Sequence, residues 1–122
     1  MRPVNIAVAG AGVIGRAHMA VIAKNPQCRL SAIADPSEAA QALAQEHGVP
    51  WYATLEALLA KALPNGVILA TPNALHVPQA LQCIAAGVPV LVEKPIAHTV
   101  ADAQKLVYAT QTHSAKVLIG HH

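Results

Sequence analysis

Apolar and polar positions follow two alternating patterns along the 122-residue chain. Short, almost continuous apolar runs rich in Val, Ile, Leu and Ala are typical of strands buried on both faces of a parallel sheet. Longer amphipathic segments lie between these runs and end near Gly, Pro or Asn, as helices do. The apolar runs predict strands at about 4–9, 28–34, 51–53, 67–70, 90–92 and 116–120. The amphipathic segments predict helices at about 13–23, 36–47, 55–62, 76–86 and 99–113.

The regular alternation of strands and helices predicts the α/β class, with a doubly wound parallel six-stranded sheet. Right-handed crossovers favour the strand order 3-2-1-4-5-6 of the Rossmann fold. The length fits one domain over residues 1–122, with no internal linker or repeat. Local signals refine the helix ends. We expect Asp35 to cap the second helix ahead of Pro36, and Pro78 to lie in the first turn of the fourth helix.

Composition narrows the classes of function. Apolar residues make up 54% of the chain and charged residues only 11%, which argues against a disordered chain. The net charge of +2 comes from scattered Lys and Arg residues, so we expect no nucleic-acid partner. No apolar run approaches the roughly 18 residues of a membrane helix, so we expect no membrane partner and a cytoplasmic location. Cys28 and Cys83 lie in apolar elements, which favours buried reduced thiols over a disulfide. The His residues show no metal-ligand spacing.

The segment 10–15, Gly-Ala-Gly-Val-Ile-Gly, follows the first predicted strand and opens the first helix. Asp35 lies 20 residues past Gly15, at the end of the second strand. Strand, glycine triplet, helix and acid together form the dinucleotide-binding arrangement. Gly10 permits a tight turn, Gly12 lets a pyrophosphate approach the backbone, and Gly15 lets the helix pack closely on the strand. The free N–H groups of the first helical turn favour an anion, and Asp35 can accept hydrogen bonds from a ribose diol.

These features predict NAD as the cofactor in preference to NADP. The 2′-phosphate of NADP would meet the carboxylate of Asp35, with Glu38 about one helical turn further on. No arginine lies between residues 30 and 60 to neutralise such a phosphate. We expect NADP to bind more weakly by about 1–3 kcal/mol.

Two further loops follow predicted strands and therefore lie at the same edge of the sheet as the glycine loop. The first is 71–73 (Thr-Pro-Asn), and the second is 93–95 (Glu-Lys-Pro). The proline restricts Lys94 to extended geometry, and we expect this lysine to point toward the nicotinamide end of a dinucleotide whose adenosine end lies at Asp35. A lysine there can polarise a carbonyl or act as a general acid. A surface ion pair with Glu93 is the alternative.

Three motifs in this order resemble the glucose–fructose oxidoreductase / inositol dehydrogenase / MocA family: the glycine loop 10–15, residues 70–76 (Ala-Thr-Pro-Asn-Ala-Leu-His), and residues 93–95. The Glu-Lys-Pro motif is the specific one, because many families share the glycine loop. The Gly-His-His at 120–122 is similar to the end of that family's nucleotide domain, and the resemblance covers essentially the whole chain. It implies an NAD-dependent oxidoreductase that transfers a hydride to or from a sugar, polyol or related hydroxy compound.

The resemblance also implies a role for each motif. The pyrophosphate would bind over Gly12, Val13 and Ile14, and the adenosine ribose would bind to Asp35. The other motif residues would line the cofactor cleft or lie beside the nicotinamide: Thr71, Pro72, Asn73, His76, Glu93 and Lys94. Lys94 would contribute to catalysis, whereas His76 would buttress its loop and is at least as well explained by a structural role. His18, in the first helix, is expected to be structural.

One departure from the family is large. The family carries a second α+β domain that holds the substrate residues and a dimerisation sheet, and nothing in this sequence corresponds to it. We therefore expect an excised domain or a truncated gene product that is catalytically incomplete alone, in which His121 and His122 are native or belong to a tag. Apolar surface that a second domain would cover, and a sixth strand at the sheet edge, lead us to expect self-association.

Two alternative functions stay open. A non-catalytic module could sense NAD(H) or mediate assembly, although Lys94 favours an enzyme because a sensor needs no proton donor at the nicotinamide. A methyltransferase that binds S-adenosylmethionine also uses a Gly-rich loop and an acid after the second strand. The Gly-x-Gly-x-x-Gly spacing and the loop 93–95 argue against that class. The sequence does not identify the substrate.

Overall fold

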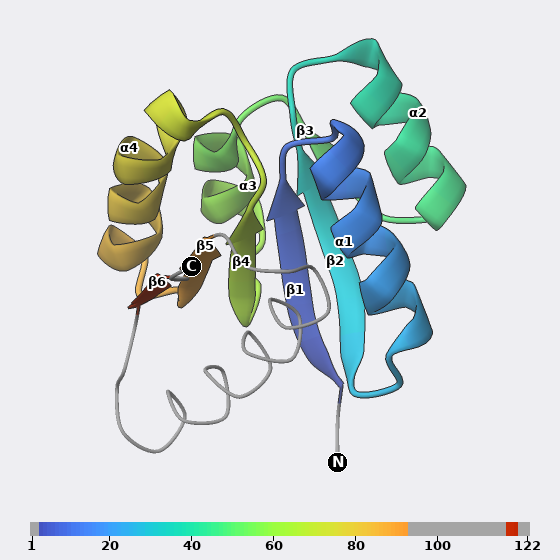
Figure 1. The fold of residues 1–122 in the computed structure, drawn as a ribbon, viewed down its shortest axis with the longest axis horizontal. Helices are drawn as coiled ribbons and strands as arrows, with labels where there is room; N and C mark the ends of the chain where they lie inside the picture. The colour runs from blue at the N-terminus through green and yellow to red at the C-terminus, as the bar shows by residue number, and fades with distance from the viewer. Residues whose placement is uncertain (1–2, 93–116, 120–122) are drawn as a thin grey trace.

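A computed structural model describes residues 3–92 and 117–119, which form a parallel sheet with helices on both faces (Figure 1). The elements follow in the order β1 (Val4–Ala9), α1 (Val13–Lys24), β2 (Cys28–Ala34), α2 (Glu38–His47), β3 (Trp51–Tyr52), α3 (Leu55–Lys61), β4 (Gly66–Leu69), α4 (Asn73–Ala85), β5 (Val90–Val92) and β6 (Val117–Ile119). The strands pair in parallel in the order β3-β2-β1-β4-β5-β6. The predicted class and strand order are therefore confirmed.

Two buried clusters hold the helices to the sheet, one on each face (Figure 1). Under α1 and α2, the cluster combines Ile6 of β1 with Met19 of α1, and both side chains are fully buried. Under α3 and α4, the strands present small residues, such as Ala7 of β1, to larger ones such as Leu58 of α3. Because β1 is apolar on both faces, its sequence shows a continuous apolar run rather than a period of two.

A register shift in β2 decides which face of the sheet each later residue of that strand occupies. The pairing of β2 with β1 slips by one residue at Ser31. Leu30 before the shift and Ile33 after it both belong to the cluster under α1 and α2, although they are three residues apart. A regular strand alternates faces with a period of two, and one extra residue reverses that phase. Asp35 consequently leaves β2 on the face where α1 begins.

The start of α2 differs from the prediction. We expected Asp35 to be the cap, but α2 begins at Glu38 and its N-cap is Ser37, whose side chain accepts a hydrogen bond from the backbone N–H of Ala40 at 3.1 Å. Asp35 instead accepts hydrogen bonds from Ser37 and from Ala11. The expected cap was wrong because a contact from a distant segment, at Ala11, engages one of the carboxylate oxygens.

The start of α4 also differs from the prediction. The helix begins at Asn73, directly after the extended Pro72, and not near His76. Pro78 therefore lies inside the helix rather than in its first turn. Both prolines are compatible with the start of a helix, and sequence alone gave no means to choose the earlier one.

Other predictions concern the rest of the chain. The strand at 116–120 is confirmed as β6, whereas the predicted helix at 99–113 lies outside the described residues. Cys28 and Cys83 are buried and free, as expected, and burial raises the pKa of the Cys83 thiol to about 11. Within residues 3–92 and 117–119, no helix is both long and apolar enough to cross a membrane. The same residues contain no cluster of His, Cys, Asp and Glu that could hold a metal ion.

Candidate functional site

Two glycines of the loop between β1 and α1 are required by the fold itself. Gly10 has a positive φ of 105°, and a Cβ there would lie 2.5 Å from the carbonyl oxygen of Ala70. A Cβ on Gly15 would lie 1.9 Å from the carbonyl oxygen of Gly10. Both distances are far below a real contact, so side chains at these positions are excluded. The loop and α1 therefore pack backbone to backbone, as predicted for Gly15, and the loop also packs against the backbone of Ala70, which was not predicted.

Gly12 differs from these two glycines. It is the N-cap of α1 and has the ordinary extended angles φ −76° and ψ −165°, which any residue can adopt. Apart from the two chain neighbours Ala11 and Val13, no described residue has an atom within 4 Å of a Cβ built at Gly12. Neither backbone strain nor crowding within the described fold thus explains a glycine here. A side chain at this position would instead enter the space in front of α1.

The N-terminus of α1 is prepared for an anion. No side chain of the described residues caps it, and its first turn (Val13-Ile14-Gly15) carries no acid. The first N–H groups of a helix lack partners within the helix and carry the positive end of its dipole. Arg16 lies on the next turn, where its Nε donates to the carbonyl oxygen of Ala11 at 3.1 Å. This guanidinium holds the loop and adds positive charge beside it.

The Asp35 carboxylate is held at a fixed position facing the glycine loop. Its Oδ2 accepts a hydrogen bond from the N–H of Ala11 at 2.8 Å, and its Oδ1 accepts one from the N–H of Ser37 at 2.8 Å. Burial acts to raise the pKa of this carboxyl, but the hydrogen bonds from Ser37 and Ala11 together outweigh it and hold the pKa below its usual value. Asp35 is therefore an anion at neutral pH. Each oxygen has a second lone pair for another donor.

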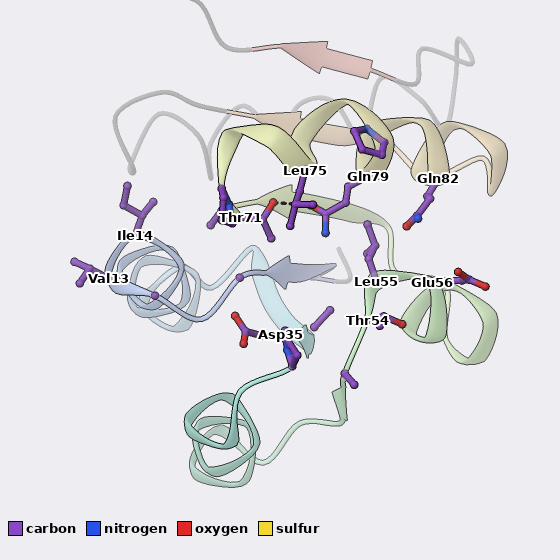
Figure 2. Close-up of a pocket in the computed structure, with 18 residues that line it drawn as sticks. Val13, Ile14, Asp35, Thr54, Leu55, Glu56, Thr71, Leu75, Gln79 and Gln82 are labelled. Atoms are coloured by element: carbon purple, nitrogen blue, oxygen red, sulfur yellow. Dashed lines mark hydrogen bonds between the residues drawn. The ribbon is translucent and has the colours of Figure 1, made fainter.

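The glycine loop, Asp35 and the start of α4 line one open pocket of about 980 Å³ (Figure 2). In this view Asp35 lies on the side opposite Thr71, Leu75 and Gln79. The Thr71 hydroxyl and Gln79 Oε1 form a hydrogen bond of 2.5 Å that ties the loop after β4 to α4. The pocket lies at the carboxyl edge of the sheet beside β1 and β4, where the strand order reverses. Ligands of doubly wound folds bind at this place.

The structure brings together most of the predicted site residues that it describes. Those that line the pocket are Gly10, Gly12, Val13, Ile14, Asp35, Thr71 and Pro72. Gly15 lies behind the loop, in contact with the backbone of Gly10. Asn73 and His76 belong to α4, but their side chains lie outside the described part, as do Glu93 and Lys94 entirely. His18 is buried on α1 at 3% exposure and is not among the residues that line the pocket.

Sequence reasoning missed one wall of the pocket. The lining residues that the prediction did not include are Ala34, Pro36, Ala53, Thr54, Leu55, Glu56, Ala70, Leu75, Pro78, Gln79 and Gln82. Figure 2 shows Glu56 and Gln82 together at the end of the pocket away from Val13 and Ile14. The topology contained a usable signal, because α3 also begins at the carboxyl edge of the sheet. The outward residues of α4 gave no signal, since exposed glutamines are ordinary on a helix.

Comparison with known proteins places this pocket in context. The profile of a family described as an oxidoreductase family with an NAD-binding Rossmann fold matches residues 4–121. The chain is 28% identical over 116 residues to the rhizopine catabolism protein MocA of Rhizobium meliloti, covering 95% of this chain and 37% of the relative. It is 34% identical over 108 residues to inositol 2-dehydrogenase 1 of Saccharopolyspora erythraea, covering 85% of this chain and 32% of that protein.

A solved structure supports the same relationship. The WlbA dehydrogenase from Chromobacterium violaceum, in complex with NADH and UDP-GlcNAcA, aligns with a TM-score of 0.76 at 30% identity. The alignment covers 98% of this chain and 35% of that one. The chain thus spans about a third of the length of these proteins, with coverage of 37%, 32% and 35%.

Proposed function

Because the chain belongs to the oxidoreductase family with an NAD-binding Rossmann fold, we propose that it is the NAD-binding domain of an enzyme that oxidises or reduces a sugar, polyol or related hydroxy compound by hydride transfer. The observation that carries the binding site is Gly12. Its glycine is needed by neither the backbone angles nor the described neighbours, yet it faces the pocket at the uncapped start of α1. A pyrophosphate in that space accounts for the missing side chain.

The described residues fit a dinucleotide in one orientation. The pyrophosphate would lie over Gly12, Val13 and Ile14, and the adenosine ribose would donate its hydroxyls to Asp35. Thr71 and Pro72 would line the opposite wall. In this orientation the anionic Asp35 would meet the 2′-phosphate of NADP and disfavour it. We therefore propose NAD as the preferred cofactor.

Titration calorimetry with Gly12→Val tests the phosphate site. Valine adopts extended angles readily, and no described atom obstructs its Cβ, so the variant is expected to fold. Its side chain would occupy the pyrophosphate volume, and NAD binding should fall below detection. Ala20→Val is the control, because Ala20 is an exposed residue of the same helix and is not among the described residues that line the pocket. A folded Gly12→Val that keeps wild-type NAD affinity overturns the site.

The substrate class rests on the relatives. Inositol 2-dehydrogenase bears the name of a polyol, and the WlbA structure contains a nucleotide sugar. NAD, when bound, would supply the hydride acceptor for an alcohol substrate. We propose that Lys94 handles the proton at the substrate oxygen, with Glu93 beside the nicotinamide ribose and Asn73 and His76 in the cofactor cleft. These four assignments come from the motif resemblance.

The 122-residue chain is proposed to be one domain, with the substrate held largely by residues outside it, since its relatives are about three times as long. Positioning of substrate against cofactor can supply about 7–11 kcal/mol of barrier reduction. The isolated chain should therefore bind NAD but turn over inositol, glucose or another polyol negligibly. Clear turnover by the purified chain would show that one domain suffices.

We also propose that the chain associates with itself. Val13 and Ile14 are exposed large apolar residues at the pocket mouth, with exposed fractions of 86% and 59%. β6 lies at the edge of the sheet within the described residues, and an edge strand invites pairing with another copy. Light scattering over a concentration series tests this, and a strict monomer at high concentration contradicts it.

Location and other partners are proposals of the same kind. Two buried free thiols, Cys28 and Cys83, fit a reducing compartment such as the cytoplasm. The scattered basic residues and the net charge of +2 favour neither a nucleic acid nor an anionic membrane surface. Fractionation and a salt-dependent pull-down with nucleic acid would check both points.

A further inference from the structure

The backbone of Asp35 is held as firmly as its side chain, and Trp51 of β3 does much of this. The indole Nε1 of Trp51 donates to the carbonyl oxygen of Asp35 at 2.8 Å. The N–H of Asp35 donates to the carbonyl oxygen of Tyr52 at 3.0 Å. Thus β3, a strand of only two residues, bonds to both peptide groups that flank the Asp35 Cα.

Trp51 bonds the Asp35 carbonyl at the point where the pairing of β2 with β3 ends. β2 stops at Ala34 and β3 stops at Tyr52, so the Asp35 carbonyl lies beyond the last pair of the two strands. Pro36 follows, and the chain turns there toward α2. The indole N–H bonds this carbonyl in place of a further strand residue. Rotation of the Asp35–Pro36 peptide would break that bond and would also move the Ser37 N–H away from Asp35 Oδ1.

Trp51 is absent from the described residues that line the pocket, and its ring packs against the buried cluster under α1 and α2. It therefore has no direct path to a ligand in that pocket. Its indole nitrogen is nevertheless hydrogen-bonded to the residue that is proposed to hold the ribose. A large aromatic ring that packs against the core is a rigid support for such a bond.

We propose that Trp51 is a positioning residue for adenosine-ribose recognition: its indole N–H fixes the Asp35 backbone and so aims the carboxylate at the ribose 2′-hydroxyl. The inference rests on the proposed function, in which Asp35 binds that ribose. It assigns to Trp51, which is half-buried, an effect on ligand selectivity that its packing alone does not predict. If the Asp35 backbone were free to rotate, its carboxylate would have to be oriented anew at each binding event. The affinity for the ribose would then be lower.

The chain contains a single tryptophan, which permits an atom-level test. Expression with benzothienylalanine in place of tryptophan exchanges only the indole N–H of Trp51 for sulphur and keeps the two fused rings. Trp51→Phe is the genetic counterpart, and Tyr52→Phe is the matched control on the same strand, since it keeps the backbone carbonyl that Asp35 uses. The probes are NAD and its analogue that lacks the 2′-hydroxyl of the adenosine ribose, titrated by calorimetry.

The measured quantity is the affinity ratio between NAD and the 2′-deoxy analogue. The wild-type chain and Tyr52→Phe should prefer NAD by about tenfold or more, the scale of one hydrogen bond to a charged group. Both Trp51 replacements should lower this ratio to about threefold or less, and affinity for the analogue should change by less than about twofold. A purely structural Trp51 would weaken both ligands equally and leave the ratio unchanged, which overturns the inference.

Asp35→Ala separates this inference from the proposed function. If Asp35 holds the ribose, the variant loses the preference for NAD over the analogue, and adding Trp51→Phe lowers the ratio no further. A wild-type chain that shows no preference, or no NAD binding, overturns the proposed site together with the inference. A wild-type preference that Asp35→Ala abolishes and Trp51→Phe preserves overturns the inference alone.

Discussion

Helices α1 and α2 cover the same face of the sheet, yet they begin in opposite ways (Figure 1). At α2, the Ser37 side chain caps the helix and Glu38 places an acid in its first turn. At α1, the cap residue is Gly12, which has no side chain to offer, and the exposed apolar residues Val13 and Ile14 follow. In α2 a neighbouring side chain accepts a hydrogen bond from the first turn, whereas in α1 the first N–H groups face a pocket.

This contrast separates stability from binding. A side-chain cap typically contributes about 1 kcal/mol to a helix, and α1 forgoes it although the angles of Gly12 would permit Ser or Asp. A position where the sequence omits an available stabilising residue is a strong indicator of function. We therefore assign the start of α1 to the proposed ligand and the start of α2 to the stability of the fold. Three substitutions test this division, beginning with the largest expected effect, and a fourth compares the buried faces of the two helices.

Gly12→Asp converts the start of α1 into one like that of α2. The new carboxylate can accept from the free N–H groups and complement the helix dipole, and the unfolded chain loses freedom, so the unfolding free energy should rise by roughly 1 kcal/mol. The same carboxylate occupies and repels the pyrophosphate, so the dissociation constant for NAD should rise by more than about 100-fold. Thermal unfolding and calorimetry measure the two effects. Increased stability with unchanged NAD affinity would contradict the assignment of this helix end.

Asp35→Ala removes the acid that lies between the two helix starts. Loss of a charge-assisted hydrogen bond to the ribose should weaken NAD binding by about 10- to 100-fold. The preference for NAD over NADP should shrink as well, because the 2′-phosphate no longer meets a carboxylate. Parallel titrations with both cofactors measure this. Tighter binding of NADP than NAD by the wild-type chain would already refute the assignment.

The features that could be predicted from the sequence are those that depend on backbone geometry. Positions 10 and 15 must be glycine, because a Cβ there would lie 2.5 and 1.9 Å from a backbone carbonyl oxygen. Such close contacts recur wherever a strand turns tightly into a helix. The strand order also followed from handedness and the buried apolar runs. These features depend on local patterns and on rules common to all parallel sheets.

The sequence did not predict contacts between distant segments. Asp35 was expected to cap α2, but Ala11, 24 residues earlier, donates to its carboxylate, and Trp51, 16 residues later, holds its carbonyl. The start of α4 and the wall formed by Gln79 and Gln82 were missed for a related reason. Nothing in the local sequence shows at which of the two prolines the helix starts. Nothing there shows which exposed polar residues face the pocket either.

Ser37→Ala tests the structural half of the comparison. Removal of the hydroxyl leaves the N–H of Ala40 without its 3.1 Å acceptor, which should cost about 1 kcal/mol of unfolding free energy. The Ser37 hydroxyl also hydrogen-bonds the Asp35 carboxylate, but the backbone N–H groups of Ser37 and Ala11 still hold that carboxylate in the variant. The dissociation constant for NAD should therefore change by less than about threefold. Chemical denaturation and NAD titration of one preparation give both numbers. A larger loss of binding than of stability would mean that the start of α2 also serves the ligand.

The smallest expected effect concerns the buried faces of the two helices rather than their ends. His18 of α1 is 3% exposed, and within the described part of the chain its Nδ1 has no hydrogen-bond partner, whereas His47 of α2 is exposed. Burial lowers the pKa of His18, so the unfolded chain binds a proton at this residue more readily than the folded one. The resulting stability is complete above the unfolded pKa of about 6.5 and is lost as the pH falls from there toward the lowered folded pKa. Between pH 7 and pH 6 this amounts to at most about 0.7 kcal/mol. His18→Leu should flatten that part of the curve of unfolding free energy against pH. An equal slope in wild type and His18→Leu would show that the fold accommodates the charged imidazole, and the buried side of α1 would then be as tolerant as the exposed side of α2.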